Sequence, residues 1–134
     1  MDFPAPCPEI PIADLADALA YYRDRLGFEI DWSDEALGLA GISRGEARLF
    51  MATAAFRDGQ SNAGPLVLWI NLSGRAEIDA LHAEWAAAGA EIVAAPEAKP
   101  WKLYEFLARD LDGNVLRASY DFAWEEEEAA PDSA

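Results

Sequence analysis

Cysteine and histidine are nearly absent from this chain, and their scarcity excludes several kinds of function. Cys7 and His82 are the only residues of their types among 134. A single cysteine forms no disulfide within the chain, which favours a reducing, cytoplasmic location. One cysteine and one distant histidine also lack the spacing of a zinc site. The sequence therefore predicts no metal and no other cofactor.

Positive charge is also scarce. Ten Lys and Arg stand against 25 Asp and Glu, which gives a net charge of −15 at pH 7. Proteins that bind nucleic acids neutralise phosphates with Lys and Arg, so neither a nucleic acid nor an anionic membrane is expected as a partner. An acidic surface suits a cationic ligand, although solubility alone is the simpler explanation.

Long hydrophobic runs are missing as well. No apolar stretch approaches the ~20 residues that cross a bilayer, and the start of the chain, residues 1–4, lacks the basic and apolar segments of a secretory signal. The hydrophobic fraction of 52 % is nevertheless enough for a packed core. We expect one domain over residues 1–124 and a solvated, disordered acidic tail over residues 125–134. The tail carries five acidic residues, so the domain keeps −10 of the net charge.

Two helical patterns divide the domain into similar halves. The first follows a capping residue, Asp14, and ends at Gly27, and the second ends at Gly89. Each glycine is followed, one residue later, by Glu-Ile, and the two glycines are 62 positions apart. This spacing indicates an internal repeat.

The remaining apolar segments are typical of strands. Asp112-Gly113 indicates a hairpin between the last two strands. The order β-α-β-β-β then occurs twice, which predicts an α+β fold of two modules, over about residues 5–56 and 65–122. Strands are expected over residues 9–12, 29–32, 38–43, 47–52, 66–72, 91–94, 104–109 and 115–122.

Aromatic side chains on strands and loops are candidate ligand contacts. In the strand over residues 66–72 the even positions are aliphatic and suit the core, so Trp69 and Asn71 share the opposite face. That face lines a cleft, or else Trp69 packs against the other module. Trp101 lies in a loop and Trp32 ends a strand, where they can join such a cleft.

Residues that often carry chemistry have simpler roles in this sequence. His82 lies one position off the apolar stripe of the second helix and is expected as a flanking or surface residue. Cys7 has no neighbouring cation or helix N-terminus to activate it, so we expect a small buried hydrophobe. Asp110 and Asp112 flank the hairpin turn, where carboxylates accept from backbone amides.

The motifs together resemble the glyoxalase/bleomycin-resistance/dioxygenase (vicinal oxygen chelate) superfamily over residues 7–122. They occupy residues 12–15, 21–29, 80–85, 89–92 and 109–114, with Leu111 where proline is usual. Lys99-Pro100-Trp101 followed by Glu105-Phe106 is similar to the bleomycin-resistance branch. The resemblance implies that the two βαβββ modules form a curved mixed sheet with a cleft.

Enzymes of this superfamily hold a divalent metal with His, Gln or Glu from the sheet of each module. The matching positions are Cys7, Leu68 or Trp69, and Arg117, none of which is His or Glu. A guanidinium cannot ligate a cation and repels it. The resemblance therefore implies no metal site, no catalytic residue and no enzymatic activity.

Bleomycin-resistance proteins are metal-free homodimers that sequester the drug in aromatic clefts between protomers. The resemblance implies a homodimer that holds a planar, cationic ligand in the same way. Pro11 occupies the edge position of the N-terminal strand that family members commonly exchange, and Leu39 stands where an aromatic residue is frequent. The implied ligand-binding residues are Trp32, Leu39, Phe50, Trp69, Asn71, Trp101, Glu105, Leu107, Arg117 and Ser119.

Two alternatives remain open. One is a superfamily enzyme, a glyoxalase-like lyase or a dioxygenase with an atypical metal site, in which Glu105 and Arg117 act as an acid–base or anion-orienting pair. The other is a binding protein whose ligand is not bleomycin-like but another aromatic metabolite.

Overall fold

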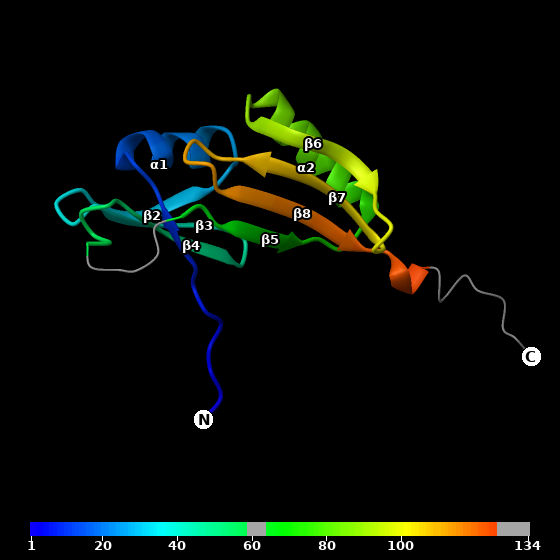
Figure 1. Cartoon of the computed structure of the whole chain (residues 1–134), viewed down its shortest axis with the longest axis horizontal. Coiled ribbons are helices and arrows are strands. Elements are labelled where there is room, and N and C mark those ends of the chain that lie inside the picture. Colours follow the sequence, from blue (N-terminus) through cyan, green and yellow to red (C-terminus); the bar gives the residue numbers. More distant parts are fainter. Residues whose placement is uncertain (59–63, 126–134) are drawn as a thin grey trace, which may run out of the picture.

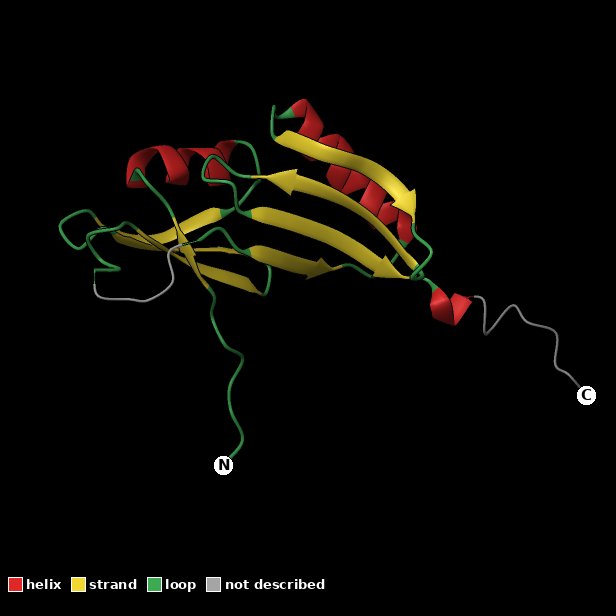
Figure 2. Ribbon diagram, in the orientation of Figure 1, coloured by secondary structure: helices red, strands yellow, loops and turns green. Residues whose placement is uncertain are grey.

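The computed structural model describes residues 1–58 and 64–125, and it confirms an α+β fold of two βαβββ modules (Figures 1 and 2). Most of the expected tail, residues 126–134, lies outside the described residues. The first module contains β1 (Glu9–Pro11), α1 (Leu15–Asp24), β2 (Glu29–Asp34), β3 (Leu39–Arg44) and β4 (Ala47–Ala52). The second contains β5 (Val67–Asn71), α2 (Arg75–Ala87), β6 (Glu91–Ala98), β7 (Leu103–Arg109) and β8 (Val115–Asp121).

Each module forms one four-stranded mixed sheet. The strand orders are β1-β4-β3-β2 and β5-β8-β7-β6, with β1 parallel to β4 and β5 parallel to β8. Each helix covers one face of the sheet in its own module and leaves the other face without a helix (Figure 2). The two modules therefore repeat the same topology, as the 62-residue spacing predicts.

The helix ends follow the expected signals. Asp14 caps α1, because its Oδ1 accepts from the amide of Asp17 at 2.8 Å. Gly27 has φ +75° and Gly89 has φ +85°, a left-handed conformation that glycine adopts without strain. Each of these glycines turns the chain from its helix into the following strand.

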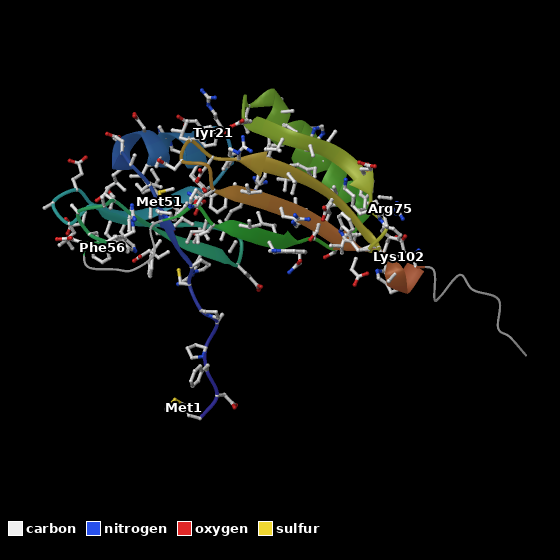
Figure 3. All side chains as sticks on the ribbon, viewed as in Figure 1. Met1, Tyr21, Met51, Phe56, Arg75 and Lys102 are labelled. Atoms are coloured by element: carbon white, nitrogen blue, oxygen red, sulfur yellow. The ribbon has the colours of Figure 1, made fainter. Side chains whose placement is uncertain are left out.

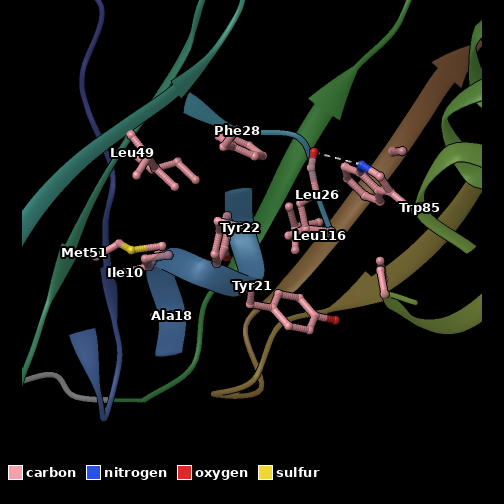
Figure 4. Packing of buried hydrophobic residues seen from close by; sticks show 14 of the residues in the cluster. Ile10, Ala18, Tyr21, Tyr22, Leu26, Phe28, Leu49, Met51, Trp85 and Leu116 are labelled. Atoms are coloured by element: carbon pink, nitrogen blue, oxygen red, sulfur yellow. Dashed lines mark hydrogen bonds between the residues drawn. The ribbon is translucent and has the colours of Figure 1, made fainter. Parts of the chain in front are cut away.

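One hydrophobic core joins the two modules (Figure 4). Trp85 of α2 is buried and its indole N–H donates to the carbonyl of Leu26, which follows α1, at 3.0 Å. Phe106 packs its ring edge-on against Trp85, with the centroids 5.6 Å apart. Burying side chains of this size contributes about 1.5–3 kcal/mol each. Trp85, held by Phe106 in its own module and bonded to Leu26 of the first, therefore helps to join the modules.

The hairpin turn between β7 and β8 is the second connection between modules. Asp110 is buried and accepts at Oδ1 from the amides of Asp112 and Asn114, as expected for a capping carboxylate. Its Oδ2 accepts from the hydroxyl of Tyr22 on α1 at 2.7 Å. Burial, followed by the charge of Asp110, raises the pKa of Tyr22 well above its usual value.

Two strands extend further than the sequence indicates. β6 continues through Pro96 to Ala98, with register shifts on both sides of Ala94. It is an edge strand, where proline is tolerated because one side of the strand makes no ladder hydrogen bonds. β2 continues past Trp32 to Asp34, with a bulge between Ile30 and Trp32.

The N-terminal segment extends away from the sheets, with Met1 at its far end (Figure 3). Strand β1 pairs with β4 of the same chain, and the side chains of Met1 and Phe3 are fully or nearly fully exposed. Strand exchange with a second chain stays a prediction. Among residues 1–58 and 64–125, neither helix has the length and apolar character that a membrane span requires.

Candidate functional site

The helix-free face of the second sheet holds six of the residues that the sequence analysis proposes. Leu68 and Ile70 pack against the core, so the alternating residues Trp69 and Asn71 point to the opposite face, as expected. Asn71 Oδ1 accepts from the hydroxyl of Ser119 at 3.3 Å. Strand register arranges the six residues in two rows across β5, β8 and β7: Trp69–Arg117–Leu107 and Asn71–Ser119–Glu105.

Arg117 connects the two rows. Its Nη1 donates to Glu105 Oε1 at 2.7 Å, and its guanidinium carbon lies 4.9 Å from the ring centre of Trp69. The side chain of Glu105 is 3 % exposed and that of Arg117 is 24 % exposed. Glu105 Oε2 and Arg117 Nε are both buried without a hydrogen-bond partner in the described part of the chain. An unpaired buried polar group costs about 1–3 kcal/mol, so a ligand group that pairs with either atom recovers that cost.

A second aromatic cluster lies on the first sheet. Trp32 and Phe50 are in contact, with their ring centroids 5.7 Å apart. Both pair with Gly41 of β3, and the indole of Trp32 lies so close over Gly41 that a Cβ there would collide with it. Leu39 follows the same alternation on β3 but is only half-buried. The cluster borders a cavity of about 380 Å³.

Arg48 and Cys7 are among the lining residues of this cavity that the sequence analysis did not propose as ligand contacts. Arg48 lies two positions before Phe50 on β4, so strand alternation alone places it on the same face. Cys7 is half-buried rather than buried, because the chain before β1 leaves the sheet, and its thiol donates to the carbonyl of Arg48 at 3.5 Å. Both therefore line the cavity beside Trp32.

Trp101 lies apart from both clusters. It is in the turn between β6 and β7, where its ring lies 5.9 Å from Lys99 Nζ. The amide of Lys102 donates to the carbonyl of Lys99 at 3.0 Å and closes this turn. Trp101 is 57 % exposed, and no recorded contact joins it to Trp69 or Arg117 in the described residues.

The two sheets meet at a smaller cavity. It measures about 200 Å³ and is lined by Arg48 from the first module and Trp69 from the second, with Pro6 and Pro8 of the N-terminal segment. The clusters on the two sheets thus approach each other at this cavity, although neither Trp32 nor Arg117 lines it.

The positions that match the family's metal ligands do not suit a divalent cation. Arg117 carries a positive charge at the position of a carboxylate, and its side chain is already paired with Glu105. Within residues 1–58 and 64–125, no three His, Cys, Asp or Glu side chains form a group that could hold a metal. His82 contacts the ring of Phe106, with centroids 5.3 Å apart, as a flanking residue of the core.

Comparison with protein families shows the family of the chain. A family profile matches residues 7–117, which is most of the chain. The chain belongs to the glyoxalase/bleomycin resistance protein/dioxygenase superfamily. This superfamily contains both enzymes and binding proteins, so membership leaves the activity open. A search of curated proteins gave no significant match.

Solved structures of superfamily members share this fold. A bleomycin-binding protein from the bleomycin producer Streptomyces verticillus, solved with copper(II)-bleomycin, is 27 % identical, with a TM-score of 0.67 over 88 % of this chain and 96 % of that one. A glyoxalase/bleomycin resistance protein/dioxygenase from Nocardioides is 18 % identical, with a TM-score of 0.74 over 90 % and 85 %. A lactoylglutathione lyase from Agrobacterium tumefaciens is 19 % identical, with a TM-score of 0.72 over 90 % and 96 %. The last two likenesses show the fold alone.

Proposed function

We propose that this superfamily member binds a planar, cationic small molecule between aromatic side chains at a homodimer interface and holds it without chemical change. The mechanism is that of the bleomycin-resistance type: the protein lowers the concentration of free ligand. Arg117, Glu105, Asn71 and Ser119 supply the polar contacts of the cleft. The protein acts in the cytoplasm.

The observation that carries this proposal is the exposure of tryptophan on the helix-free side of the sheets. Trp32 is 42 % exposed and Trp69 is 55 % exposed, although both lie within strands. Stacking of a planar ring on an aromatic side chain is worth ~1–3 kcal/mol in other systems, so two or three such contacts support micromolar binding. The 27 % identity with a protein solved with copper(II)-bleomycin supports the same ligand class.

Charge determines how the ligand lies at Trp69. The net charge of −15 attracts a cation toward the protein. Arg117 already stacks on one face of Trp69, so a ligand ring is expected to stack on the other face or on the guanidinium itself. Glu105 Oε2, which is buried and has no hydrogen-bond partner among the described residues, is the acceptor for a cationic or N–H group of the ligand.

A second copy of the chain supplies the other wall of the cleft in this proposal. The two rows of residues across β5, β8 and β7 lie on a sheet face that no helix of the described residues covers. The N-terminal segment carries exposed apolar residues such as Phe3. An extended segment of this kind is stabilised when it lies on a partner chain.

A titration with metal-free and copper-loaded bleomycin tests the proposal. We expect saturable binding at micromolar ligand, weakened about tenfold or more in Trp69→Ala and in Trp32→Ala, because each loses a stacking contact of ~1–3 kcal/mol. Trp124→Ala is the matched control, since Trp124 is 46 % exposed but packs on Tyr120 away from the proposed cleft. Equal loss in all three variants contradicts a cleft formed by Trp32 and Trp69.

The buried pair of Glu105 and Arg117 favours one alternative, a superfamily enzyme in which the two residues act as an acid–base or anion-orienting pair and any metal is held at an atypical site elsewhere. Stoichiometric Ni, Zn, Mn or Fe in protein purified without added metal would support that alternative against the proposal. A thermal-shift screen of aromatic metabolites addresses the remaining alternative, in which the fold and cleft are the same and the ligand differs from bleomycin.

A further inference from the structure

A separate cavity of about 460 Å³ lies between the turn that joins β3 to β4 and the helix α2. Its volume falls within the range of small-molecule sites, ~300–1,000 Å³. We call it the α2 hollow. Its lining consists of Phe28, Arg44, Gly45, Ala47, Ile70, Leu72, Glu77, Ala80, Leu81, Glu84 and Trp85.

The α2 hollow lies on the opposite side of the second sheet from the proposed cleft. Ile70 lines the hollow, whereas its neighbours Trp69 and Asn71 point to the helix-free face. Because successive residues of a strand face opposite sides of the sheet, Trp69 does not line the hollow. The smaller cavity that Trp69 lines shares Phe28, Ala47 and Ile70 with the hollow, so the two cavities adjoin at the edge strand β5.

The internal repeat explains why the hollow is larger than the cavity of about 270 Å³ at the equivalent place in the first module. In each module the chain leaves the first strand and enters the helix at an equivalent place, which we call the corner of the module. The amide of Ile12, after β1, donates to the carbonyl of Ala52 at 3.1 Å, and the amide of Leu72, after β5, donates to the carbonyl of Ser119 at 2.8 Å. In the first module the turn between β7 and β8 lies at this corner and leaves the cavity of about 270 Å³ beside Ile12 and Asp112. Asp112 there accepts from the amide of Ala13 at 2.9 Å.

The turn at the corner of the second module is shorter. Two residues separate β3 from β4, whereas five separate β7 from β8. The short turn reaches only the far end of α2, where Arg44 donates to both oxygens of Glu84, at 2.6 and 2.9 Å, and to the carbonyl of Leu26 at 2.7 Å. The space beside Leu72 and the start of α2 is left as the hollow.

The lining indicates the chemistry of an occupant. The walls are mostly apolar, and Arg44 and Glu84 neutralise each other within their ion pair. Glu77, at the start of α2, is exposed, and its side chain has neither an ion pair nor a hydrogen bond within the described residues. One carboxylate without a partner beside an apolar surface is complementary to an organic cation with an apolar body.

We propose that the α2 hollow binds a small hydrophobic cation, an alkyl or aryl ammonium whose apolar body rests on Leu72 and Leu81 and whose charge faces Glu77. Trp69 does not line this site. Occupation of the hollow covers apolar surface that the shorter turn of the second module leaves exposed.

Calorimetric titration with 3-phenylpropyl-trimethylammonium tests this site on the full chain. We expect saturable binding that is unchanged in Trp69→Ala, because Trp69 does not line the hollow. The neutral analogue 3-phenylpropanol is expected to bind at least about threefold more weakly, and the anion 3-phenylpropanoate more weakly still. Equal affinity for the cation and the anion overturns the proposal, and so does loss of binding in Trp69→Ala.

Two variants and one matched control localise the binding. Glu77→Gln is expected to weaken cation binding about fivefold, as an exposed ion pair allows. Asp17→Asn is the control, because Asp17 is the third residue of α1 as Glu77 is the third residue of α2. Equal weakening by both variants contradicts a local role of Glu77.

Ala80→Phe fills the hollow from an exposed helix position, so the variant is expected to fold. It is expected to abolish binding of the ammonium probe while the thermal unfolding midpoint stays within a few degrees. Sedimentation velocity is run on the same variant. If Ala80→Phe instead changes the oligomeric state, the hollow is a contact between copies of the chain, and the ligand proposal is wrong.

Discussion

At the scale of single residues, the ion pair of Glu105 and Arg117 is the most buried ion pair of the described residues, so its disruption is expected to lower the stability of the fold. Glu105 is nearly completely buried, and within residues 1–58 and 64–125 its side chain has one hydrogen-bond partner, Arg117. Removing one partner of a buried pair leaves an uncompensated charge, which costs about 3–5 kcal/mol. Because Arg117 is 24 % exposed and water reaches the pair, we expect Arg117→Ala to lower the free energy of unfolding by about 3 kcal/mol.

Urea denaturation measures this change. The double variant Glu105→Leu/Arg117→Leu is the control, because it removes both charges and fills a similar volume, and it is expected to recover most of the stability. A loss below about 1 kcal/mol in Arg117→Ala would show that water or another group compensates Glu105.

The sequence predicts which face each residue of β5 occupies, but not how deeply the polar residues lie. Alternation alone separates Trp69 from Ile70, because the pleat of a strand fixes it. The same rule puts Glu105 on the face of Trp69, yet it contains no information about the side chains that cover that face. The near-complete burial of Glu105 and the stacking of Arg117 on Trp69 needed the structure.

At the scale of elements, the bond between Tyr22 and Asp110 joins α1 to the turn between β7 and β8. The pKa of Tyr22 is raised in the folded state, mainly by burial. In the unfolded chain the phenol titrates near ~10. Stability from this group is therefore complete below about pH 10 and is lost as the pH rises toward the pKa of the folded state.

We expect the free energy of unfolding to fall by up to ~1.4 kcal/mol per pH unit above about pH 10 because of Tyr22. The matched variant Tyr22→Phe is expected to lose this part of the slope, and to cost about 1 kcal/mol at neutral pH. Other tyrosines titrate in both proteins, so the difference between the two pH profiles is the measurement. Identical slopes in the two proteins would mean that Tyr22 does not couple folding to alkaline pH.

The order of the elements could be predicted from the sequence because each helix carries its own end signals. Asp14 caps α1, and Gly27 and Gly89 follow the two helices, where the structure places a left-handed turn. The extension of β6 through Pro96 was missed, since proline disfavours a strand unless its free side faces outward. Edge position is a property of the assembled sheet and is absent from the local sequence.

At the scale of the whole molecule, the account requires two chains. Full-length protein is expected to sediment as a dimer at micromolar concentration. A variant without residues 1–8 is expected to dissociate at least about tenfold more readily, because it lacks the extended segment that carries Phe3. A single monomer mass for the full-length protein at micromolar concentration contradicts the dimer.

The superfamily could be recognised from motifs distributed over both modules, since the glycines and hairpin residues are fixed by backbone geometry. The ligand cannot be derived in the same way. Side chains such as Trp32 and Trp69 reveal stacking, and the charge of −15 favours a cation, yet neither specifies one molecule. The cavity beside α2 was also beyond sequence reasoning, because it depends on how far the turn between β3 and β4 reaches.

The central claim is that the protein holds its ligand without altering it. The most direct measurement is equilibrium dialysis against copper(II)-bleomycin, followed by mass spectrometry of the ligand released from the protein. The account predicts saturable uptake at micromolar ligand and release of bleomycin with unchanged mass. Release of a modified compound, or no saturable uptake at millimolar ligand, would contradict it.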